Sequence, residues 1–586
     1  MHFRQAILKV DRQTFTLQPG RSNSFDEIYA DFQQQPEAGG ERWSVFLHPK
    51  QDVTIRRLEI QFDLPLPPDA RFFANGFQSW SESRLYGLNE TIPRLPFFAR
   101  SFMGKYGDEL IPDIPRGRGK LHSWTYTLIH RNTARGYAPI EKKPAVLFAG
   151  SLNERTGFTL FLYDRQSGIL TVRKDMDGLQ LSHSFPALDF WIGEGSEQAV
   201  FDRYFDLLEI PKPEGNPVIG WTSWYRHFTA VSEETVTQNL EGFAGFCAEN
   251  ERNGFFQIDD GWQTAVGDWH SVKPAFPQGM GAVAQKIRAR GLSPGIWLAP
   301  FVAAKDSELV RKHPDWLLKE KDGRLLRVGW NPHWNGWYHA LDFYNNEVRN
   351  HLGGVFHTLL DRWGFDLLKV DFLFAACLAP PPGKTRGQVM YEAMEFLHKL
   401  AGPKKILACG VPLGAAFGLA DYCRIGGDVH TAWEHRLLGL LRFRERVSTI
   451  ASLRSTLGRW QLNGRAFHSD PDVFILRAEQ QQLSPEQQYS LLVINVLLGN
   501  LLFTSDDLAQ YSPEQTAELQ AALDWQGSRL LALNDLGGDF YSIEFENRGQ
   551  RYFASLNLSS RKFALSATGK AEDMELQPFE SIILKC

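Results

Sequence analysis

The sequence has few cysteines, and none of them are spaced as a CxxC pair. The five cysteines (Cys247, Cys377, Cys409, Cys423 and Cys586) are an odd number scattered along the chain. Disulfide-stapled domains and structural zinc sites both need clustered, paired cysteines. We therefore expect neither a disulfide framework nor a metal site, and we expect no cofactor.

Long apolar runs and an excess of one charge sign are also missing. The opening residues, MHFRQAILKVDRQTF, do not resemble a secretory signal, and no segment has the ~20 apolar residues that cross a bilayer. A cytoplasmic protein without a membrane partner is the expectation. Charged residues make up 22% of the chain and the net charge is only −5, so no nucleic-acid partner is expected.

Aromatic residues, by contrast, are abundant, with 17 tryptophans and 42 phenylalanines. Core packing is the simpler explanation for them. The more specific one is a carbohydrate-binding surface, because the flat apolar face of a sugar stacks on an aromatic ring. Composition alone favours core packing.

The chain is longer than one hydrophobic core usually supports, so a multidomain fold is expected. Short alternating runs such as VTIRRLEIQFDL predict an N-terminal antiparallel β-sandwich over 1–210. Apolar strands then alternate with helical stretches and predict a central (β/α)8 TIM barrel over 211–510. Short strands resume near 515 and predict a small C-terminal antiparallel β-domain over 511–586. A doubly wound sheet is the alternative to the barrel, but no glycine-rich phosphate loop follows the first strand.

One candidate barrel strand, FDLLKVDFLF (365–374), carries two charges in an otherwise apolar run. Lys369 and Asp371 stand two residues apart, so their side chains lie on the same side of the strand. Burying an unpaired charge costs several kcal/mol, so two charges need a reason to be there. A structural ion pair is one reason, and by itself it is somewhat the better explanation. A functional strand end is the other.

Other predicted strands also end in charged or aromatic residues. The eight candidate strands lie at 217–224, 254–262, 292–301, 365–372, 404–410, 421–427, 466–474 and 499–508. Their ends carry Trp221, Trp224, Asp259, Asp260, Trp297, Lys369, Asp371, Arg424, Asp428, Asp470 and Asp472. Each aspartate taken singly also fits a turn or a helix cap, and Asp470-Pro-Asp472 is turn chemistry by default. Because catalytic groups gather at the carboxyl ends of barrel strands, their common location favours an active site.

Two facing carboxylates with aromatic walls are the equipment of glycoside hydrolysis. One carboxylate has to be ionised as the nucleophile and the other has to be protonated as the acid, so their surroundings need to push the two pKa values apart. Lys369, two residues before Asp371, is expected to lower the pKa of that carboxyl group. Asp428 suits the acid/base role less decisively.

The ordered motifs QIDDGWQ (257–263), GIWLAPF (295–301), LKVDFLF (368–374), ILACG (406–410) and CRIGGD (423–428) resemble the α-galactosidases of glycoside hydrolase family 36, in clan D. The resemblance runs through all three expected domains and is greatest between about 219 and 475. The form of the LKVDFLF motif looks most like the smaller bacterial and thermophile-type members. NGFQSW (75–80) resembles the segment by which the family's β-sandwich reaches the active site.

The resemblance implies a role for each matching residue. Asp371 is implied as the nucleophile and Asp428 as the acid/base. The residues implied to bind the sugar are Asp259 and Asp260 at O4 and O6, Lys369 at O3 or O4, Arg424 and the Cys409-Gly410 turn near O2, and Trp80, Trp224 and Trp297 as walls. The family is retaining and uses no metal.

Some positions depart from the family pattern. Val370 and Leu373 replace the Trp and Asn of larger members, Val411-Pro412 replaces Ser-Pro, and Gly427 replaces Pro. The Val411-Pro412 change touches the O2 side, so specificity at C2 is the least secure inference. The sequence thus predicts a retaining exo-α-galactosidase of small oligosaccharides such as melibiose or raffinose. α-N-Acetylgalactosaminidase and a non-catalytic galactoside-binding protein are the alternatives.

Overall fold

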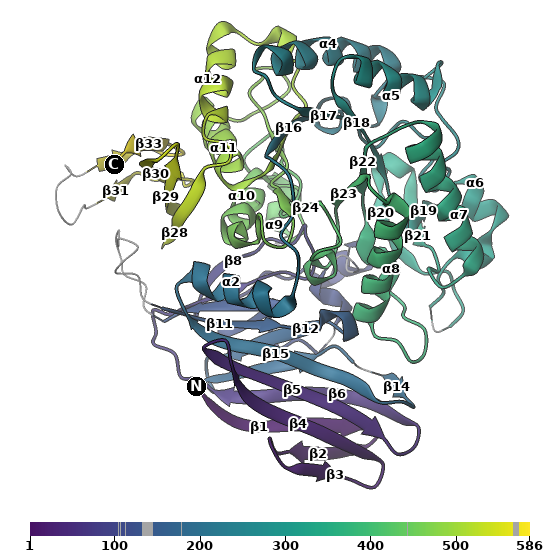
Figure 1. Cartoon of the computed structure of the whole chain (residues 1–586), viewed down its shortest axis with the longest axis vertical. Helices are drawn as coiled ribbons and strands as arrows, with labels where there is room; N and C mark the ends of the chain where they lie inside the picture. Colours follow the sequence, from purple (N-terminus) through teal and green to yellow (C-terminus); the bar gives the residue numbers. More distant parts are fainter. Residues whose placement is uncertain are drawn as a thin grey trace.

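The N-terminal part of the protein is built from two antiparallel sheets (Figure 1). The computed structural model describes residues 1–103, 105, 107–111, 113–131, 145–176, 178–320, 322–441, 443–565 and 574–586. The first sheet has the order β2-β1-β6-β13-β12-β9, with β14 also paired to β6. Its strands are β1 His2–Val10, β2 Gln13–Leu17, β6 Val53–Asp63, β9 Lys120–Trp124, β12 Thr159–Asp164, β13 Ile169–Lys174 and β14 Leu179–Leu181.

The second sheet has the order β3-β4-β5-β15-β11-β10-β7-β8. Its strands are β3 Ser22–Ser24, β4 Ile28–Glu37, β5 Gly40–Pro49, β7 Arg71–Ala74, β8 Arg84–Gly87, β10 Tyr126–His130, β11 Val146–Ser151 and β15 Phe185–Gly195. Leu8 and Ile60 of the first sheet share one core cluster with Trp43 and Phe190 of the second. The alternating residues that predicted strands therefore bury one face of each sheet against the other.

A helix follows these sheets within the range expected to be all β. It is α2, Glu197–Leu208, and Ser196 caps its N-terminus by accepting a hydrogen bond from the Ala199 backbone N–H. The buried side chains of α2, among them Phe201 and Tyr204, pack against Phe148 of β11. Twelve residues near the end of the predicted sandwich therefore form a helix that packs against the second sheet.

A curled sheet of parallel strands occupies the centre of the protein. Its order is β25-β24-β23-β22-β18-β17-β16-β27-β26. The strands are β16 Val218–Thr222, β17 Gly254–Ile258, β18 Ser293–Leu298, β22 Leu367–Val370, β23 Lys405–Ala408, β24 Tyr422–Arg424, β25 His468–Asp470, β26 Val473–Phe474 and β27 Leu501–Thr504. Each of the eight segments predicted as strands contains one of these strands or, at 466–474, the pair β25 and β26.

Helices between the parallel strands cover the outside of the curled sheet (Figure 1). They are α4 Glu233–Glu249, α5 Gly279–Ala289, α7 Asn346–Phe356, α8 Arg386–Ala401, α10 Thr449–Gly458 and α11 Pro485–Leu498. The connection from β23 to β24 has only a short 3-10 turn, Leu413–Ala416. A small antiparallel sheet of β19 Val302–Ala304, β20 Arg327–Asn331 and β21 Gly336–Ala340 is inserted after β18. The sequence had not predicted this insertion.

The strands of the C-terminal part begin later than expected. Pro513–Leu523 forms helix α12, because Ser512 and Gln515 make a capping box and Pro513 suits the first helical turn. A four-stranded antiparallel sheet follows, with β28 Arg529–Gly537, β29 Phe540–Asn547, β30 Gln550–Asn557 and β33 Ser581–Lys585. β31 Phe563–Leu565 and β32 Met574–Leu576 pair separately. The prediction that strands resume near 515 is therefore wrong, because helix α12 occupies this segment and the first strand begins at Arg529.

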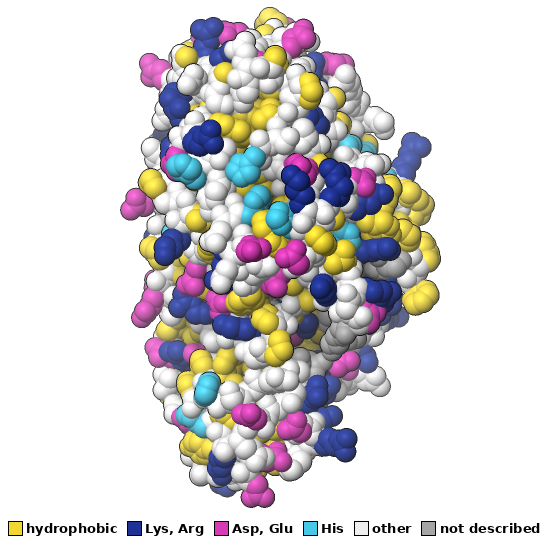
Figure 2. Space-filling model, turned by 90° about the vertical axis from the view of Figure 1, so that its right-hand side faces the viewer, with side chains coloured by type: hydrophobic (Ala, Val, Ile, Leu, Met, Phe, Trp, Pro, Cys, Tyr) yellow, Lys and Arg dark blue, Asp and Glu magenta, His cyan; other side chains and the backbone are white. Residues whose placement is uncertain are grey.

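The surface carries both charge signs. On the face shown in Figure 2, Lys and Arg side chains are interspersed with Asp and Glu side chains, and neither kind covers the face as one continuous patch. Within the part of the chain that the structure describes, no helix is long and apolar enough to span a membrane.

Candidate active site

The charged residues predicted at the strand ends are buried and lie close together. Asp259 and Asp260 directly follow β17, Lys369 lies in β22, and Asp371 directly follows that strand. All four side chains belong to residues that are at most 8% exposed. Their burial means that each charge needs a specific partner.

Asp371 is held by donors on both of its carboxylate oxygens. Trp297 Nε1–H donates to Oδ2 at 3.0 Å, and the Phe372 backbone N–H donates to Oδ1 at 2.9 Å. Phe372 has a left-handed φ of 54°, a strained conformation for a bulky residue. Burial raises the pKa of Asp371, whereas Lys369 and the Trp297 hydrogen bond lower it, and burial prevails. The expected lowering by Lys369 is therefore present but outweighed.

Lys369 forms its closest ion pair with another strand. Its Nζ lies 2.8 Å from Asp259 Oδ2. Burial by itself would lower the pKa of Lys369, but the Asp259 carboxylate raises it above its ordinary value, so the ammonium stays charged. Asp259 Oδ2 also accepts a hydrogen bond from Gln257 Nε2 at 2.7 Å. Lys369 and Asp371 are thus not a simple pair, because Lys369 bridges from β22 to the end of β17.

Asp260 is bound by a residue of the insertion. Trp334 Nε1–H donates to Asp260 Oδ2 at 2.7 Å, and Gln263 Nε2–H donates to Oδ1 at 2.6 Å. Burial raises the pKa of Asp260 to about 6, against the lowering effect of these two hydrogen bonds. The ring of Trp334 packs 4.8 Å from that of Phe372, so the insertion lies over the site. The aromatic-rich run WNPHWNGW (330–337) was the available signal for this residue.

Asp428 is the most exposed of the carboxylates, with a side chain that is 36% exposed. Its Oδ1 accepts from Arg424 Nη1 at 2.9 Å. The other nitrogens of Arg424 face Asp470, at 3.0 Å from Nε, and Asp472, at 2.9 Å from Nη2. The guanidinium of Arg424 therefore has a carboxylate partner on every nitrogen, and its expected place near O2 of the sugar stays a prediction. The DPD segment, which sequence reasoning favoured as a turn, supplies two of them.

The Cys409-Gly410 turn lies against Trp80 of the N-terminal part. Trp80 Nε1–H donates to Cys409 Sγ at 3.0 Å. The Trp80 ring packs edge-on to Phe372, with centroids 5.0 Å apart. A Cβ placed on Gly410 would lie 2.9 Å from the Trp80 ring, so only glycine fits there. Trp80 is half-buried, and it joins the two parts of the chain beside Asp371.

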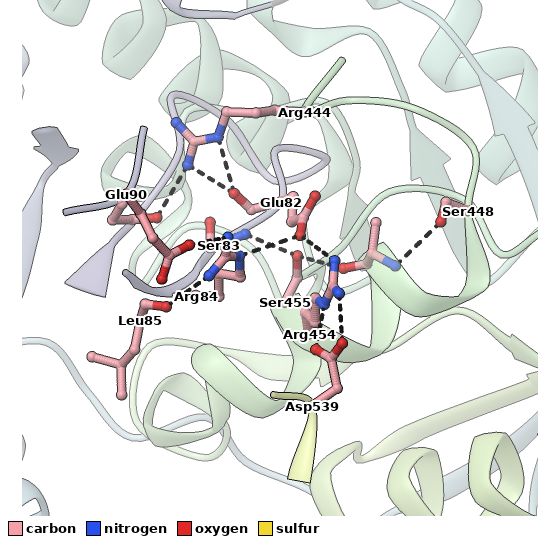
Figure 3. A network of polar contacts seen from close by, with 12 residues as sticks. Glu82, Ser83, Arg84, Leu85, Glu90, Arg444, Ser448, Arg454, Ser455 and Asp539 are labelled. Atoms are coloured by element: carbon pink, nitrogen blue, oxygen red, sulfur yellow. Dashed lines mark hydrogen bonds and ion pairs between the residues drawn. The ribbon is translucent and has the colours of Figure 1, made fainter. Parts of the chain in front are cut away.

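A buried arginine docks the segment that carries Trp80. Arg459 donates to Asn75 Oδ1 at 2.9 Å, to the Ser79 carbonyl at 2.7 Å and to the Ile425 carbonyl at 2.9 Å. Glu82, in the same segment, accepts a hydrogen bond from Arg454 (Figure 3). Arg454 also binds Asp539 of the C-terminal part. Burial by itself would raise the pKa of Glu82, but Arg446, Arg454 and Arg84 lower it to about 2.

The ring of Trp224 packs against other aromatic rings. Trp224 begins the short helix α3, Trp224–His227, rather than ending β16, and its ring contacts are Phe228 and His333. Trp221 is fully buried and donates to the Asp506 carbonyl at 3.1 Å. The structure therefore brings ten of the eleven predicted site residues into one connected set, with Trp224 at its edge.

Two further residues were not predicted from the sequence. Tyr225 O–H donates to Asp472 Oδ2, and Trp334 binds Asp260. Within the described residues, no three His, Cys, Asp or Glu side chains are arranged to hold a metal ion. The carboxylates of the site are partnered by Lys369, Arg424 and neutral donors, an arrangement suited to binding hydroxyl groups and transferring protons.

Comparison with known proteins identifies relatives of this site. The Melibiase family profile matches residues 230–377. α-Galactosidase 1 of Pediococcus pentosaceus is 28% identical over 158 residues, which is 25% of this chain and 20% of that protein. A Flavonifractor plautii protein named A type blood α-D-galactosamine galactosaminidase is 25% identical over 244 residues, 37% of this chain and 22% of its own length. The chain thus spans only about a fifth of the length of these curated relatives.

A solved structure matches nearly the whole chain. TtGalA, an α-galactosidase from Thermus thermophilus in complex with p-nitrophenyl α-D-galactopyranoside, has a TM-score of 0.70 and is 28% identical. The match covers 89% of this chain and 98% of that one. In profile, sequence and fold, the chain is similar to α-galactosidases, the proteins that its motifs resemble.

Proposed function

We propose that the chain is a retaining, exo-acting α-galactosidase that hydrolyses terminal α-D-galactosyl residues of small oligosaccharides such as melibiose and raffinose. The observation that carries this is the buried carboxylate of Asp371, which is held by Trp297 and Phe372 and lies near enough to the half-buried Asp428 for the two charges to interact. One fixed, buried carboxylate beside one accessible carboxylate suits a nucleophile and an acid/base.

The reaction proceeds in two displacements. Asp371 Oδ attacks the anomeric carbon, and the bond to the leaving oxygen breaks as Asp428 gives that oxygen its proton. Water then attacks the anomeric carbon of the glycosyl-enzyme, Asp428 takes the proton from that water, and Asp371 leaves. Two inversions return the α configuration. The mechanism requires the two carboxyl groups to be ~5–5.5 Å apart, as in retaining enzymes.

The other predicted residues bind galactose. Asp259, Asp260 and Lys369 form one polar wall, which suits the axial O4 and the O6 hydroxyl. Both aspartates already accept hydrogen bonds from protein donors, so their orientation is fixed before the sugar arrives. Trp80 and Trp297 form the aromatic walls, and the Cys409-Gly410 turn lies on the O2 side. This assignment follows the resemblance and is supported by the common location of these side chains.

The finer architecture belongs to the same proposal. β25 pairs with β24, β26 pairs with β27, and only Pro471 and Asp472 separate β25 from β26. If β25 and β26 count as one strand position, eight positions close into a (β/α)8 barrel. We place the sandwich at 1–210, the barrel at 211–510 and the C-terminal β-domain at 511–586. A cytoplasmic location also remains a prediction from the sequence.

The test combines a labelling experiment with product stereochemistry. A mechanism-based fluorosugar of galactose should label the peptide that contains Asp371, and NMR of the first product formed should show the α anomer. Labelling of another residue would refute the nucleophile assignment. A β anomer as first product would refute the retaining mechanism.

α-N-Acetylgalactosaminidase is the second candidate, favoured by the match to the Flavonifractor plautii protein. A panel of p-nitrophenyl α-galactoside and p-nitrophenyl α-N-acetylgalactosaminide separates the two. We expect the galactoside to be preferred, because Trp80 and Gly410 are packed closely on the O2 side. Binding of galactose without cleavage of either substrate would indicate the non-catalytic alternative.

A further inference from the structure

Arg424 is surrounded by more negative charge than it can balance. Its three nitrogens contact Asp428, Asp470 and Asp472, all within 3.0 Å. The Arg424 side chain is 2% exposed, and those of Asp470 and Asp472 are at most 1% exposed. An arginine stays protonated in proteins, so one positive charge faces three carboxyl groups. If all three were ionised, the cluster would carry a surplus of two negative charges in a buried setting.

Asp470 and Asp472 are fixed more firmly than Asp428. Asp470 Oδ1 accepts from the Asp472 backbone N–H at 2.9 Å. Asp472 Oδ2 accepts from the Val429 backbone N–H at 2.7 Å and from Tyr225 O–H. Asp472 also has a left-handed φ of 79°, an uncommon conformation away from glycine. The Val429 bond ties Asp472 to the residue directly after Asp428, so the cluster sets both the position and the charge environment of Asp428.

A lone arginine at 2.9 Å would strip the proton from a carboxyl group, which is the opposite of what a general acid needs. We propose that Asp470 and Asp472 are positioning residues which hold Arg424 and offset its charge beside Asp428, the residue proposed as the acid/base. This inference rests on the acid/base role proposed for Asp428. The inference also explains why Arg424, Asp470 and Asp472 are all buried here, since binding a sugar hydroxyl would need only one carboxylate.

Of the other described titratable groups near Asp428, only Lys369 is a cation, and its ammonium is paired with Asp259. Asp371, directly after β22, is a further carboxyl neighbour, and Cys409, after β23, and Tyr225, on α3, also interact with Asp428. Burial raises the pKa values of Cys409 and Tyr225, so both stay uncharged at neutral pH. Burial also raises the pKa of Asp472 to about 7, helped by Asp428 and Asp470 and opposed by Arg424. The carboxylates therefore compete for one cation.

The test is the alkaline limb of kcat/KM against pH, measured on an unactivated substrate such as melibiose. Asp472→Asn removes one anion from Arg424, so Asp428 loses its proton more readily and the limb should move to lower pH by about one unit. Tyr225→Phe removes a donor that keeps Asp472 ionised and should move the limb the same way by about half a unit. On a dinitrophenyl galactoside, whose leaving group needs little protonation, neither substitution should shift the limb.

The chain provides a matched control nearby. Tyr511 O–H donates to Asp506 Oδ2 at 2.7 Å, and Asp506 pairs with Arg477 at 2.6 Å, which repeats the Tyr–Asp–Arg arrangement. Because Arg477 also donates to the Tyr225 carbonyl, the control removes the tyrosine hydroxyl and leaves the Asp506–Arg477 pair intact. Tyr511→Phe should leave the alkaline limb in place.

A second measurement does not depend on catalysis. Infrared difference spectroscopy of the full-length protein follows the carboxyl band of Asp428, assigned by its absence in Asp428→Asn. Its titration midpoint should fall in Asp472→Asn and Tyr225→Phe and stay in Tyr511→Phe. An unmoved midpoint in both folded test variants overturns the inference. If the wild type cleaves no α-galactoside, the proposed function fails, and this titration still decides whether the cluster controls the proton on Asp428.

Discussion

The hydrogen bond from Trp297 to Asp371 offers the sharpest test of the proposed nucleophile. Trp297 Nε1 lies 3.0 Å from Asp371 Oδ2, and both residues are buried. Trp297→Phe keeps an aromatic ring and removes this donor. A hydrogen bond to a charged group contributes about 1.5–3 kcal/mol, and 1.36 kcal/mol corresponds to one pKa unit. Its loss should therefore raise the pKa of Asp371 by about 1–2 units, beyond the rise that burial already causes.

The assay is the acid limb of kcat/KM against pH with p-nitrophenyl α-galactoside. The nucleophile has to be ionised, so activity is lost as pH falls through its pKa, and a raised pKa moves the limb to higher pH. The limb of Trp297→Phe should lie about 1–2 units above that of the wild type, by the same arithmetic. Activity well above the limb should recover to a large fraction of the wild-type value.

Trp269→Phe is the matched control. Trp269 is fully buried and packs 5.9 Å from Trp297, and its Nε1 has no hydrogen-bond partner in the described part of the structure. The substitution removes the same atoms from the same aromatic cluster without removing a bond to Asp371. An acid limb that stays in place in Trp297→Phe, or that moves equally in Trp269→Phe, would refute the reasoning.

Three further predictions follow from the same site. Asp428→Ala should reduce turnover of melibiose far more than that of a dinitrophenyl galactoside, and equal losses on both would mean that another residue is the acid. Asp260, whose pKa is raised to about 6, is expected to bind a sugar hydroxyl more strongly when ionised, so KM for galactosides should rise as pH falls below 6 and this rise should be absent in Asp260→Asn. Trp80→Ala should lower kcat/KM by about one to two decades, and it should also lower the melting temperature, because the half-buried ring contacts Phe372 and Cys409. A kinetically silent Trp80→Ala would remove the N-terminal part from the site.

The parallel strands were predictable because each is a short apolar run between helical stretches. The same pattern located Asp259, Asp371 and Asp428, since a charge at the end of an apolar strand stands out in sequence. Which charged side chains pair with one another was harder to predict from the sequence. Lys369 stands two residues before Asp371 in the sequence and yet pairs with Asp259, 110 residues away, because the curl of the sheet brings the side chains of β22 and of the end of β17 together across β18.

The features that sequence reasoning missed depend on long-range contacts. Trp334 lies in an insertion of short strands with no strong periodicity, and it binds Asp260 from 74 residues away. The DPD segment reads as a turn because aspartate and proline favour turns locally. Its function becomes visible only when Arg424 of the neighbouring strand is placed beside it.

The contribution of the N-terminal part to the site rests on charge rather than on apolar contact alone. Glu82 is 3% exposed and lies within 3.1 Å of both Arg446 and Arg454, and Arg454 in turn binds Asp539 through two hydrogen bonds of 2.8 Å. Removing one partner of a buried pair leaves an uncompensated charge, which costs about 3–5 kcal/mol. Loss of any one of these partners should therefore weaken the whole contact between the N-terminal part and the rest of the chain. Glu82 stands two residues after Trp80. The indole is therefore held over the Cys409-Gly410 turn by a network that spans all three parts of the chain, and loss of the C-terminal sheet should disturb the sugar site although no residue of that sheet contacts Asp371 among those described.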